Sequence, residues 1–465
     1  MKYRDFVASK AVYASACGFD PSELAGPLFG HQDALARWAV RRGRAAVFAS
    51  TGLGKTRVYL SWADAVARQT GGRVLVLTPL AVAPQGAAEA AVMGLDARVA
   101  RDGSEVCAPI TVTNYDRLHR FDPSAFAGVV IDESSCIKHH DAKTLRTLLD
   151  AFSQTPYRLA CTATPAPNDW TELGTHAEFL GVCTRAEMLA EYFVHDGGST
   201  QDWRLKGHAR EAFWRWVSSW GALVRSPADL GFDAAGYDLP ALSVEQRTLA
   251  ADVASAHAAG LLFAQPARSL SERRNARRGS VDARVAACAA RVNADAEPWV
   301  VWCDLNAESE ALVAAIPGAV EVRGSHDADE KERRLADFSA GRTRVLVTKP
   351  SIAGWGLNWQ HCARTAFVGV TDSWEAYHQA VRRFWRFGQR RPVQVHVYAS
   401  ELEGAVVSNL ARKERDAQAM ADALSAETRD SVRAAVLGAR RDVNPYEPRV
   451  RMHVPAWLRT VEDAA

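Results

Sequence analysis

Two stretches of the chain alternate short apolar runs with amphipathic helical patterns. From about residue 30 to 180 the apolar runs include "AAVFAS", "RVLVLTP" and "GVVIDE", and the helical stretches between them include "RVYLSWADAVAR". A second series begins near residue 298 with "PWVVWCD" and continues through "RVLVTKP" to "VQVHVYA". Because strands that alternate with helices form parallel sheets, the pattern predicts an α/β protein with two parallel-sheet domains.

The rest of the chain shows no such alternation. With 465 residues, of which 48% are hydrophobic, the chain is long enough for two or three domains with separate cores. The segment between the two series contains the turn-rich stretch "GYDLPALSV" and is otherwise predicted to be helical, and prolines near the C-terminus predict irregular chain. We therefore expect an N-terminal helical segment (1–28), a first domain (29–184), a mainly helical insertion and linker (185–297), a second domain (298–437) and an irregular C-terminal tail (438–465).

Composition limits the classes of protein that the chain can represent. The formal net charge is only +2, so a surface for a polyanion would need locally clustered positive charge. The eight cysteines stand singly, without a C-x-x-C pair or the Cys/His spacing of a zinc site, which is typical of reduced core thiols in a cytosolic protein. No apolar run approaches the roughly 18 residues of a membrane-spanning helix, so we expect neither secretion nor a membrane partner.

The strongest local motif is "ASTGLGKT", which lies between an apolar strand and a helical pattern, as a phosphate-binding loop does. Its two glycines allow backbone N–H groups to turn towards phosphate oxygens, Lys55 can reach the β- and γ-phosphates, and Thr56 can ligate Mg²⁺. The alternative is a glycine turn that matches by chance. The expected nucleotide-binding residues of this loop are Thr51, Gly52, Leu53, Gly54, Lys55 and Thr56.

A second motif, "VVIDESS", places two acids at the end of an apolar strand. Parallel sheets hold their ligands at the carboxyl ends of strands, so we expect Asp132 to hold a metal ion and Glu133 to orient or deprotonate an attacking water. The alternative is an Asp-Glu pair that only caps a helix. The phosphate loop upstream favours the catalytic interpretation.

Two weaker motifs accompany these. "TATP" follows a further apolar strand, and the hydroxyls of Thr162 and Thr164 can sense the nucleotide and relay its state; the alternative is a strand-ending turn at Pro165. Gln32 lies one helix ahead of the phosphate loop. Its amide can recognise an adenine edge, or the residue can be a surface or capping glutamine.

The second half of the chain contains two further motifs, "VLVTKPSIAGWGLNWQHC" and "QAVRRFWRFGQRRPVQVHVY". Together with the motifs of the first half, they resemble those of superfamily-2 helicases and nucleic-acid translocases, most closely the chromatin-remodeller-like (Swi/Snf-type) branch. The first is similar to the fifth motif of that superfamily, and the second to its sixth, which has the form Q-A-x-G-R-x-x-R-x-G-Q in this branch. The resemblance runs from roughly residue 25 to 435. The chain also resembles compact helicase-like proteins of bacteriophages.

The resemblance implies two tandem RecA-like domains with ATP and Mg²⁺ between them. The first domain would supply the phosphate loop and the metal carboxylate, and the second would supply arginine fingers for the charge that develops on the γ-phosphoryl group. The implied catalytic residues are Lys55, Asp132, Glu133, Arg383 and Arg386; the implied metal ligands are Thr56 and Asp132; and Gln32, Gly356 and Gln379 join the loop in binding ATP.

The spacing within "QAVRRFWRFGQR" supports this role for the two arginines. Arg383 and Arg386 are one turn apart in a predicted helix and would share a face. Phe384 and Trp385 are then expected to pack the helix onto the second domain. Arg390 and Arg391, beyond Gln389, remain for DNA or solvent.

In the resembled family, nucleic acid crosses both domains. Thr113, Asn114 and Tyr115 match a first-domain motif that touches nucleic acid there, and Trp355 and Asn358 lie in the corresponding loop of the second domain. For each of them a core or turn role is an equal alternative. Contacts of this kind are made to the backbone, so binding would be salt-sensitive and independent of sequence.

The chain departs from the family pattern at four positions. Ser50 stands where the branch often has an acid, and Arg382 stands where glycine is usual. Ser134 and Ser135 replace an Ala-His pair that commonly follows the two acids. Coupling of hydrolysis to movement that uses that histidine would have to run through other groups here, with Thr162 and Thr164 as candidates.

Two clusters have structural alternatives. In "WRLKGHAREAFWRWVSSW", Phe213, Trp216 and Trp220 fall on one helical face, which favours a core over a base-stacking wedge. The stretch "ERRNARRGSVDAR" (272–284) carries five arginines. It can be a solvated helix face, a phosphate contact or an interdomain pairing surface.

These motifs predict a DNA-dependent ATPase that translocates along DNA. Two alternatives remain: a nucleic-acid-binding clamp that ATP only switches, and an RNA-directed remodelling ATPase. The expected partner is DNA, duplex or single-stranded, without sequence specificity, with a replication or recombination protein as a further possible partner. The expected location is the cytoplasm of a bacterial or phage-infected cell.

Overall fold

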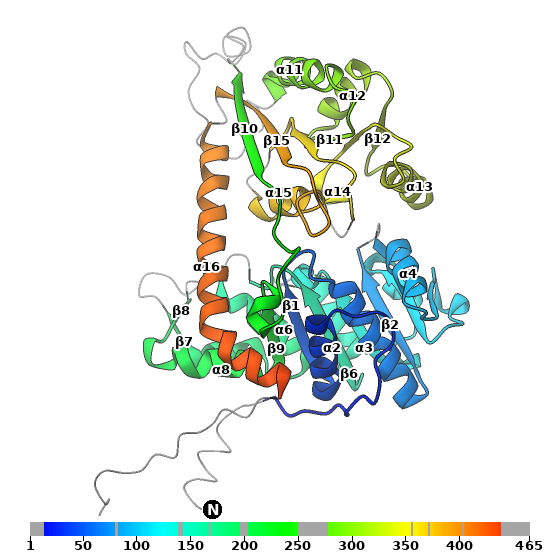
Figure 1. The fold of residues 1–465 in the computed structure, drawn as a ribbon, viewed down its shortest axis with the longest axis vertical. Helices are drawn as coiled ribbons and strands as arrows, with labels where there is room; N and C mark the ends of the chain where they lie inside the picture. The colour runs from blue at the N-terminus through cyan, green and yellow to red at the C-terminus, as the bar shows by residue number, and fades with distance from the viewer. Residues whose placement is uncertain are drawn as a thin grey trace, which may run out of the picture.

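The computed structural model of the protein describes most of the chain. The described residues are 14–79, 82–137, 143–166, 169–195, 203–249, 278–354, 357–370, 373–401 and 404–438. Within them the chain forms two domains, each built on one parallel sheet (Figure 1). The predicted α/β fold class is therefore confirmed.

The sheet of the first domain has seven strands in the order β3-β4-β2-β5-β6-β1-β9, and every pairing in it is parallel. The sheet is buried on both faces, which explains why the middles of its central strands are apolar on both sides. The strands are β1 (Arg44–Ala49), β2 (Arg73–Thr78), β3 (Ala97–Val99), β4 (Ile110–Asn114), β5 (Phe126–Asp132), β6 (Tyr157–Thr162) and β9 (Gly221–Val224).

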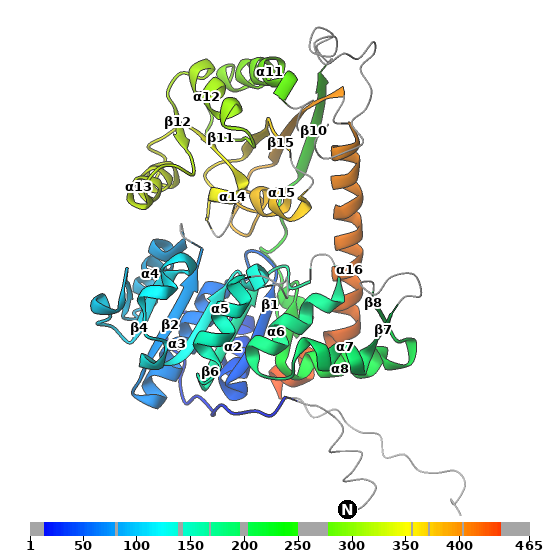
Figure 2. The same cartoon turned by 180° about the vertical axis from the view of Figure 1, so that it is seen from behind.

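Helices cover both faces of this sheet, as Figure 2 shows from the side opposite to Figure 1. On one face lie α2 (Gly30–Arg42), α3 (Lys55–Thr70) and α4 (Ala83–Val92). On the other lie α5 (Lys143–Phe152), α6 (Leu173–Leu180), α7 (Arg185–Tyr192) and α8 (Arg210–Trp220). Two separate apolar cores result, one on each face of the sheet.

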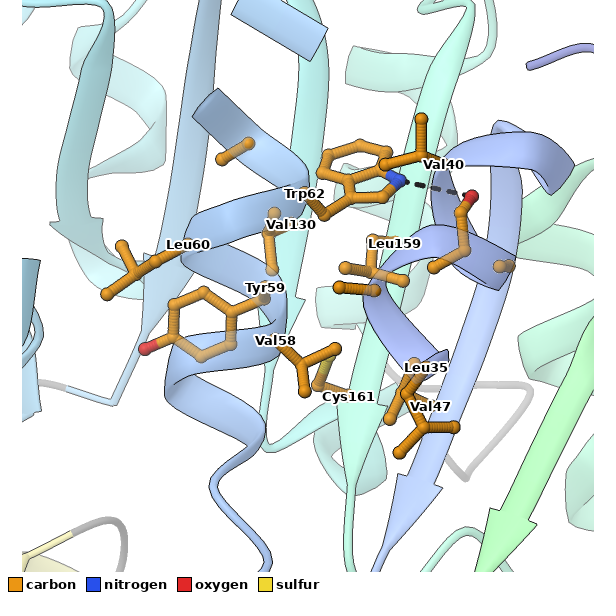
Figure 3. Packing of buried hydrophobic residues seen from close by; sticks show 14 of the residues in the cluster. Leu35, Val40, Val47, Val58, Tyr59, Leu60, Trp62, Val130, Leu159 and Cys161 are labelled. Atoms are coloured by element: carbon orange, nitrogen blue, oxygen red, sulfur yellow. Dashed lines mark hydrogen bonds between the residues drawn. The ribbon is translucent and has the colours of Figure 1, made fainter. Parts of the chain in front are cut away.

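Successive residues of β1 illustrate this division. Val47 belongs to the core under α2 and α3, whereas Phe48 belongs to the opposite core and meets Trp220 edge to face. In Figure 3, Trp62 fills the space between α3 and α2, and its indole N–H donates to the carbonyl of Ala39 at 3.3 Å. This packing fixes the helix that follows the phosphate loop against the helix that precedes it.

The second domain has a six-stranded parallel sheet in the order β10-β15-β14-β11-β13-β12. Its strands are β10 (Leu242–Leu249), β11 (Trp299–Trp302), β12 (Ala319–Val322), β13 (Val345–Thr348), β14 (Arg364–Phe367) and β15 (Val393–Ser400). Its helices are α11 (Val281–Asn293), α12 (Asn306–Ala315), α13 (Ala328–Ser339), α14 (Pro350–Ala353) and α15 (Trp374–Val381). Here too a separate apolar core lies on each face.

A long helix, α16 (Gly404–Leu437), follows the second sheet and runs back along one side of the molecule to the first domain (Figure 1). There it packs against α8, β9 and α2. Arg429 pairs with Asp229 at 3.3 Å, and Glu427 pairs with Arg210 at 2.9 Å. The two domains are thus connected twice by the chain.

The N-terminal segment differs from the prediction. Residues 14–28, the part of 1–28 that is described, form no helix. Pro21 and Pro27 interrupt helical hydrogen bonding here, and Phe19 and Leu24 pack against the core under α2 and α3. The predicted helix is therefore wrong for residues 14–28.

In its described residues, the segment 185–297 contains α7, α8 and α11 but also four strands. β9 completes the first sheet and β10 completes the second, while β7 (Phe193–His195) pairs with β8 (Trp203–Leu205) as an antiparallel hairpin. The prediction of a mainly helical segment without strands is therefore wrong for the described residues. β9 has only four residues, and β10, "LSVEQRTL", is an exposed polar edge strand, so neither gives a strong period-two signal.

Candidate nucleotide site between the two domains

The predicted phosphate loop lies between β1 and α3, as expected. Gly52 and Gly54 have φ angles of 91° and 81°, which L side chains rarely adopt. A Cβ on Gly54 would lie 2.1 Å from Nε2 of Gln32, so the loop also needs glycine for space. Backbone N–H groups at the start of α3 are therefore available to an anion.

Lys55 is the first residue of α3 and points back along the loop. Its Nζ donates to the carbonyl of Ala49 at 2.8 Å. Burial lowers the pKa of Lys55, while the nearby carboxylates of Glu133 and Asp132 raise it. Because the ammonium group of Lys55 is buried away from water, an anion such as a phosphate that binds beside it would stabilise its charge.

Gln32 and His31 hold the phosphate loop from α2. Nε2 of Gln32 donates to the carbonyl of Leu53 at 3.1 Å, and its Oε1 accepts from the backbone N–H of Phe29 at 3.1 Å. His31 reaches the same carbonyl of Leu53 at 3.2 Å. In this structure Gln32 therefore caps its own helix and supports the loop. One hydrogen of its side-chain amide remains as a donor for an adenine edge.

The two acids lie at the carboxyl end of β5, across from Lys55. Burial first, and then the charge of Glu133, raise the pKa of Asp132 to about 7. Glu133 has a φ of 53°, the only positive φ at a non-glycine residue among those described. Its Oε2 is buried without a hydrogen-bond partner. Thr56, Asp132 and Glu133 line the same cavity, and their oxygens are a donor set that fits Mg²⁺ held jointly with substrate phosphates.

Arg383 and Arg386 come from the second domain. Arg383 is buried and fully bonded: Nε donates to the carbonyl of Gln379 at 2.9 Å, Nη2 to Oε1 of Gln379 at 2.9 Å, and Nη1 to the carbonyl of Leu357 at 3.2 Å. Arg386 shares the Leu357 carbonyl at 3.3 Å, and its Nε has no partner. Burial first, and then the charge of Arg383, lower the pKa of Arg386 to about 9.

These arginines are not on a helix, contrary to the prediction. α15 ends at Val381, and the next residues form successive turns. The two side chains nevertheless face the same cavity, because the turn folds back over Leu357. Phe384 is fully buried in the second domain, and Trp385 is partly buried with its indole bonded to the carbonyl of Pro240 at 2.7 Å. The expected packing role of both aromatics is therefore observed.

One cavity of about 60 Å³ collects these groups from both domains. It is smaller than the roughly 300–1,000 Å³ of ordinary ligand pockets, so a nucleotide would have to separate the domains slightly. Val82 and Gln85, at the start of α4, also line it and were not predicted. The other residues around it are Thr51, Gly52, Gly54, Lys55, Thr56, Asp132, Glu133, Asn358, Arg383 and Arg386.

Asn358 is therefore placed differently from the prediction. It lines the nucleotide cavity, and its Oδ1 is buried without a partner. It follows Leu357, whose carbonyl holds both arginines, so the loop faces the phosphate loop. Trp355 and Gly356, which were assigned to nucleic acid and to ATP, lie outside the described residues.

The candidate nucleic-acid residues of the first domain are not on its surface. Thr113 and Asn114 are buried, and Oδ1 of Asn114 accepts from the backbone N–H of Arg117 at 3.1 Å as a helix cap. The hydroxyl of Tyr115 donates to the carbonyl of Asp132 at 2.6 Å. The turn or core alternative fits these three residues better than direct contact does.

The aromatic residues next to the phosphate loop form an interdomain contact. Tyr237, from the linker, stacks on Phe387 of the second domain at 4.5 Å, and both meet Phe29 edge to face. A Cβ on Gly52 would lie 2.7 Å from the Cβ of Phe387. The second domain thus rests directly on the phosphate loop. A separate cavity of about 510 Å³ lies beside this contact, lined partly by α16.

The "TATP" threonines lie beside the site and do not line its cavity. Thr162 ends β6 and is fully buried, and its Oγ1 accepts from the backbone N–H of Thr164 at 3.2 Å. Oγ1 of Thr164 is buried without a partner. The segment therefore forms a compact turn next to the acidic pair, since β6 pairs with β5.

Of the two ambiguous clusters, the aromatic one is structural, and the basic one has one buried arginine and, at Arg278, one exposed arginine among the described residues. Trp214, Trp216 and Trp220 are buried in the core under α8, which fits the core alternative. In the basic stretch, Arg284 is fully buried and pairs with Glu308 at 2.7 Å. Residues 272–277 of that stretch lie outside the described residues.

None of the described helices is both long and apolar enough to cross a membrane. No group of three or more His, Cys, Asp or Glu side chains in the described part of the chain is arranged to hold a metal ion. All eight cysteines are free, and Cys17, Cys107 and Cys136 are exposed, so the expectation of core thiols is wrong for these three.

Comparison with known proteins adds the following. Residues 299–388 match the family described as "Helicase conserved C-terminal domain"; this range includes the turn that carries both arginines. Among solved structures, the Sulfolobus solfataricus SWI2/SNF2 ATPase core in complex with dsDNA is similar at 17% sequence identity and a TM-score of 0.41, covering 90% of this chain and 98% of that chain. No curated protein matches the chain.

Proposed function

We propose that the protein hydrolyses ATP between its two domains and uses their closing and opening to move along DNA. The observation that carries the proposal is the single cavity lined by the phosphate loop, the acidic pair and the two arginines. The match of residues 299–388 to the helicase C-terminal family supports it independently. The proposal extends to DNA because the motifs of both domains resemble those of DNA translocases.

Each charged group has a role that its position suits. Backbone N–H groups of the phosphate loop and Lys55 bind the β- and γ-phosphates. Thr56 and Asp132 would hold Mg²⁺, which neutralises phosphate charge. Glu133, whose Oε2 is buried and unpaired, accepts a proton from the attacking water.

The arginines make hydrolysis depend on domain closure. Arg386 has an unpaired Nε and an unfavourably buried charge, so an anion that develops on the γ-phosphoryl group attracts it. Arg383 is fixed by Gln379 and Leu357 and adds positive potential beside it. Because both come from the second domain, turnover requires that domain to be in place.

The DNA track is proposed to cross the carboxyl edge of the first sheet. Arg101 follows β3, and Arg117 and Arg120 follow β4, so three arginines lie at this edge. Arg101 also approaches Asp329 of the second domain, 3.5 Å away, so the edge lies next to that domain. Phosphate contacts by such residues are independent of sequence and weaken with salt.

The experiment offers single-stranded DNA, duplex DNA and RNA separately at matched salt and measures ATP turnover, followed by displacement of a triplex-forming strand from duplex DNA. We expect DNA to stimulate turnover and ATP to drive displacement. Stimulated turnover without displacement would favour an ATP-switched clamp, and stronger stimulation by RNA would favour an RNA-directed enzyme. The variant Lys55→Ala, which removes the phosphate-binding ammonium group, is the control for contaminating ATPases.

A further inference from the structure

A buried histidine of α6 contacts the turn that carries the two acids. His176 is fully buried, and its Nε2 lies 3.1 Å from Oγ of Ser134, the residue directly after Glu133. Ser134 begins the short 3-10 turn Ser134–Ile137 and is itself fully buried. We propose that His176 is a positioning residue that holds the acidic turn and connects it to the segment of the "TATP" threonines. The proposal rests on the proposed ATPase function.

The hydrogen-bond contacts favour one tautomer of this histidine. Nδ1 of His176 lies 3.4 Å from the carbonyl oxygen of Glu172, which can only accept, and this contact favours hydrogen on Nδ1. Nε2 is then the acceptor, and the hydroxyl of Ser134 donates to it. Burial lowers the pKa of His176 to about 4, so the ring is neutral at physiological pH. Phe48 packs edge-on against the ring at 5.2 Å and restricts its rotation.

The acidic turn needs external support. Glu133 is held at a positive φ, a conformation that persists only where the surroundings impose it. On one side of the turn, the hydroxyl of Tyr115 bonds to the carbonyl of Asp132. On the other side, the bond from Ser134 to His176 is the matching contact. The carboxylate of Glu133 is thus aimed by two anchors on its neighbours.

α6 also connects this anchor to the candidate coupling segment. β6 ends at Thr162, the chain continues through the "TATP" turn to the 3-10 turn Trp170–Glu172, and α6 follows at once. His176 is bonded to Glu172 at the start of α6, and α6 packs against both β6 and the acidic turn. A shift of Glu133 during turnover would therefore move α6 together with the segment that contains Thr162 and Thr164.

Thr175 provides a matched control. It is the neighbour of His176 on α6, it is fully buried, and its Oγ1 donates to the same carbonyl of Glu172 at 2.8 Å. No hydrogen bond from its side chain reaches the acidic turn among the described residues. A purely structural requirement for buried hydrogen bonds in α6 would affect Thr175→Ala and His176→Ala alike.

The experiment compares wild type, His176→Ala, His176→Gln and Thr175→Ala in steady-state ATP turnover, with thermal unfolding to establish that each variant is folded at the assay temperature. We expect His176→Ala to lower kcat by about 10²-fold, as misplacement of a reacting group does, with the ATP KM unchanged. His176→Gln, whose amide oxygen can still accept from Ser134, should recover most of that loss. Thr175→Ala should keep the wild-type kcat.

Three outcomes would overturn the proposal: a folded His176→Ala variant with wild-type kcat, an equal loss of kcat in Thr175→Ala, or no recovery in His176→Gln. If His176→Ala does not fold, the kcat of His176→Gln is compared with that of Ser134→Ala, because only the latter removes the donor. We then expect the lower kcat in Ser134→Ala, and equal kcat values would overturn the proposal. Imidazole ¹⁵N spectra of the wild type should show a neutral ring protonated at Nδ1, and protonation at Nε2 instead would contradict the acceptor role of that atom. The ¹⁵N measurement does not depend on ATPase activity. A wild-type protein without ATP turnover would therefore refute the proposed function but not the contact between His176 and Ser134.

Discussion

Replacing Arg386 by alanine should separate ATP binding from ATP hydrolysis. The side chain reaches the cavity from the second domain and makes one hydrogen bond, from Nη1 to the carbonyl of Leu357 at 3.3 Å. If it stabilises charge only in the transition state, its loss should lower turnover by about 10³–10⁵-fold, as for other arginine fingers, which corresponds to roughly 4–7 kcal/mol of activation free energy. ATP binding, which rests on the phosphate loop, should change little.

The same substitution should not destabilise the fold. Burial and the neighbouring Arg383 lower the pKa of Arg386 to about 9, which means that its charge is unfavourable in the unliganded protein. We therefore expect the melting temperature of Arg386→Ala to equal or exceed that of the wild type.

The assays are a fluorescent-nucleotide titration, steady-state turnover and thermal unfolding. Arg390→Ala is the control, because that side chain is exposed, lies in the same turn region and does not line the cavity. Turnover of Arg386→Ala within tenfold of the wild type, or a large loss of nucleotide binding with normal residual turnover, would refute the assignment.

Three further predictions concern the loop, the metal ligand and acid stability. Gly52→Ala places a Cβ at a φ of 91° and 2.7 Å from the Cβ of Phe387, and the backbone strain costs about 1–2 kcal/mol. Both the melting temperature and ATP turnover should fall. Unchanged values would contradict the interdomain contact. Asp132→Asn should greatly weaken activation by Mg²⁺ in a titration of turnover, whereas a wild-type Mg²⁺ profile would remove Asp132 from the metal site. Burial lowers the pKa of His176 from 6.5 to about 4. As the pH falls, the histidine is therefore protonated in the unfolded chain before it is protonated in the folded protein. The free energy of unfolding should fall by about 3 kcal/mol between pH 6.5 and pH 4. Denaturant unfolding at stepped pH should show a loss smaller by that amount in His176→Gln, and equal losses in both proteins would contradict the buried neutral ring.

Local motifs were the most predictable part of the site. Lys55 begins the helix that follows β1 and its loop, and Asp132 is the last residue of β5, so both lie at the edge where parallel strands end, as the sequence predicts. The two domains followed from the same alternation of strands and helices. These features depend on residues close together in the chain.

Features that depend on residues far apart were not predictable. The bond between Ser134 and His176 joins positions 42 residues apart, and the stacking of Tyr237 on Phe387 joins the linker to the second domain. Asn358 was assigned to nucleic acid because its motif resembles a contact loop, whereas the fold of that loop turns it to the nucleotide cavity. Gln85 carries no signal of its own, and only its position after β2 at the carboxyl edge of the sheet points to the site.

Arg383 and Arg386 face the same cavity, as predicted, although the helix that was predicted to carry them ends before them. A spacing of three residues puts two side chains on one face of a helix, but the helix ends at Val381. The side chains still converge, because both donate to the carbonyl of Leu357. Hydrogen bonds to a distant backbone group, and not helical periodicity, set their direction.

The proposed function requires that DNA stimulate ATP hydrolysis at one site built by both domains. It is tested most directly by the rate of ATP hydrolysis of the purified protein with and without duplex DNA, measured in parallel for Lys55→Ala. We predict hydrolysis that rises on addition of DNA, declines again with increasing salt, and is absent from Lys55→Ala. Hydrolysis that persists in Lys55→Ala, or a wild-type rate that no nucleic acid changes, would contradict the account.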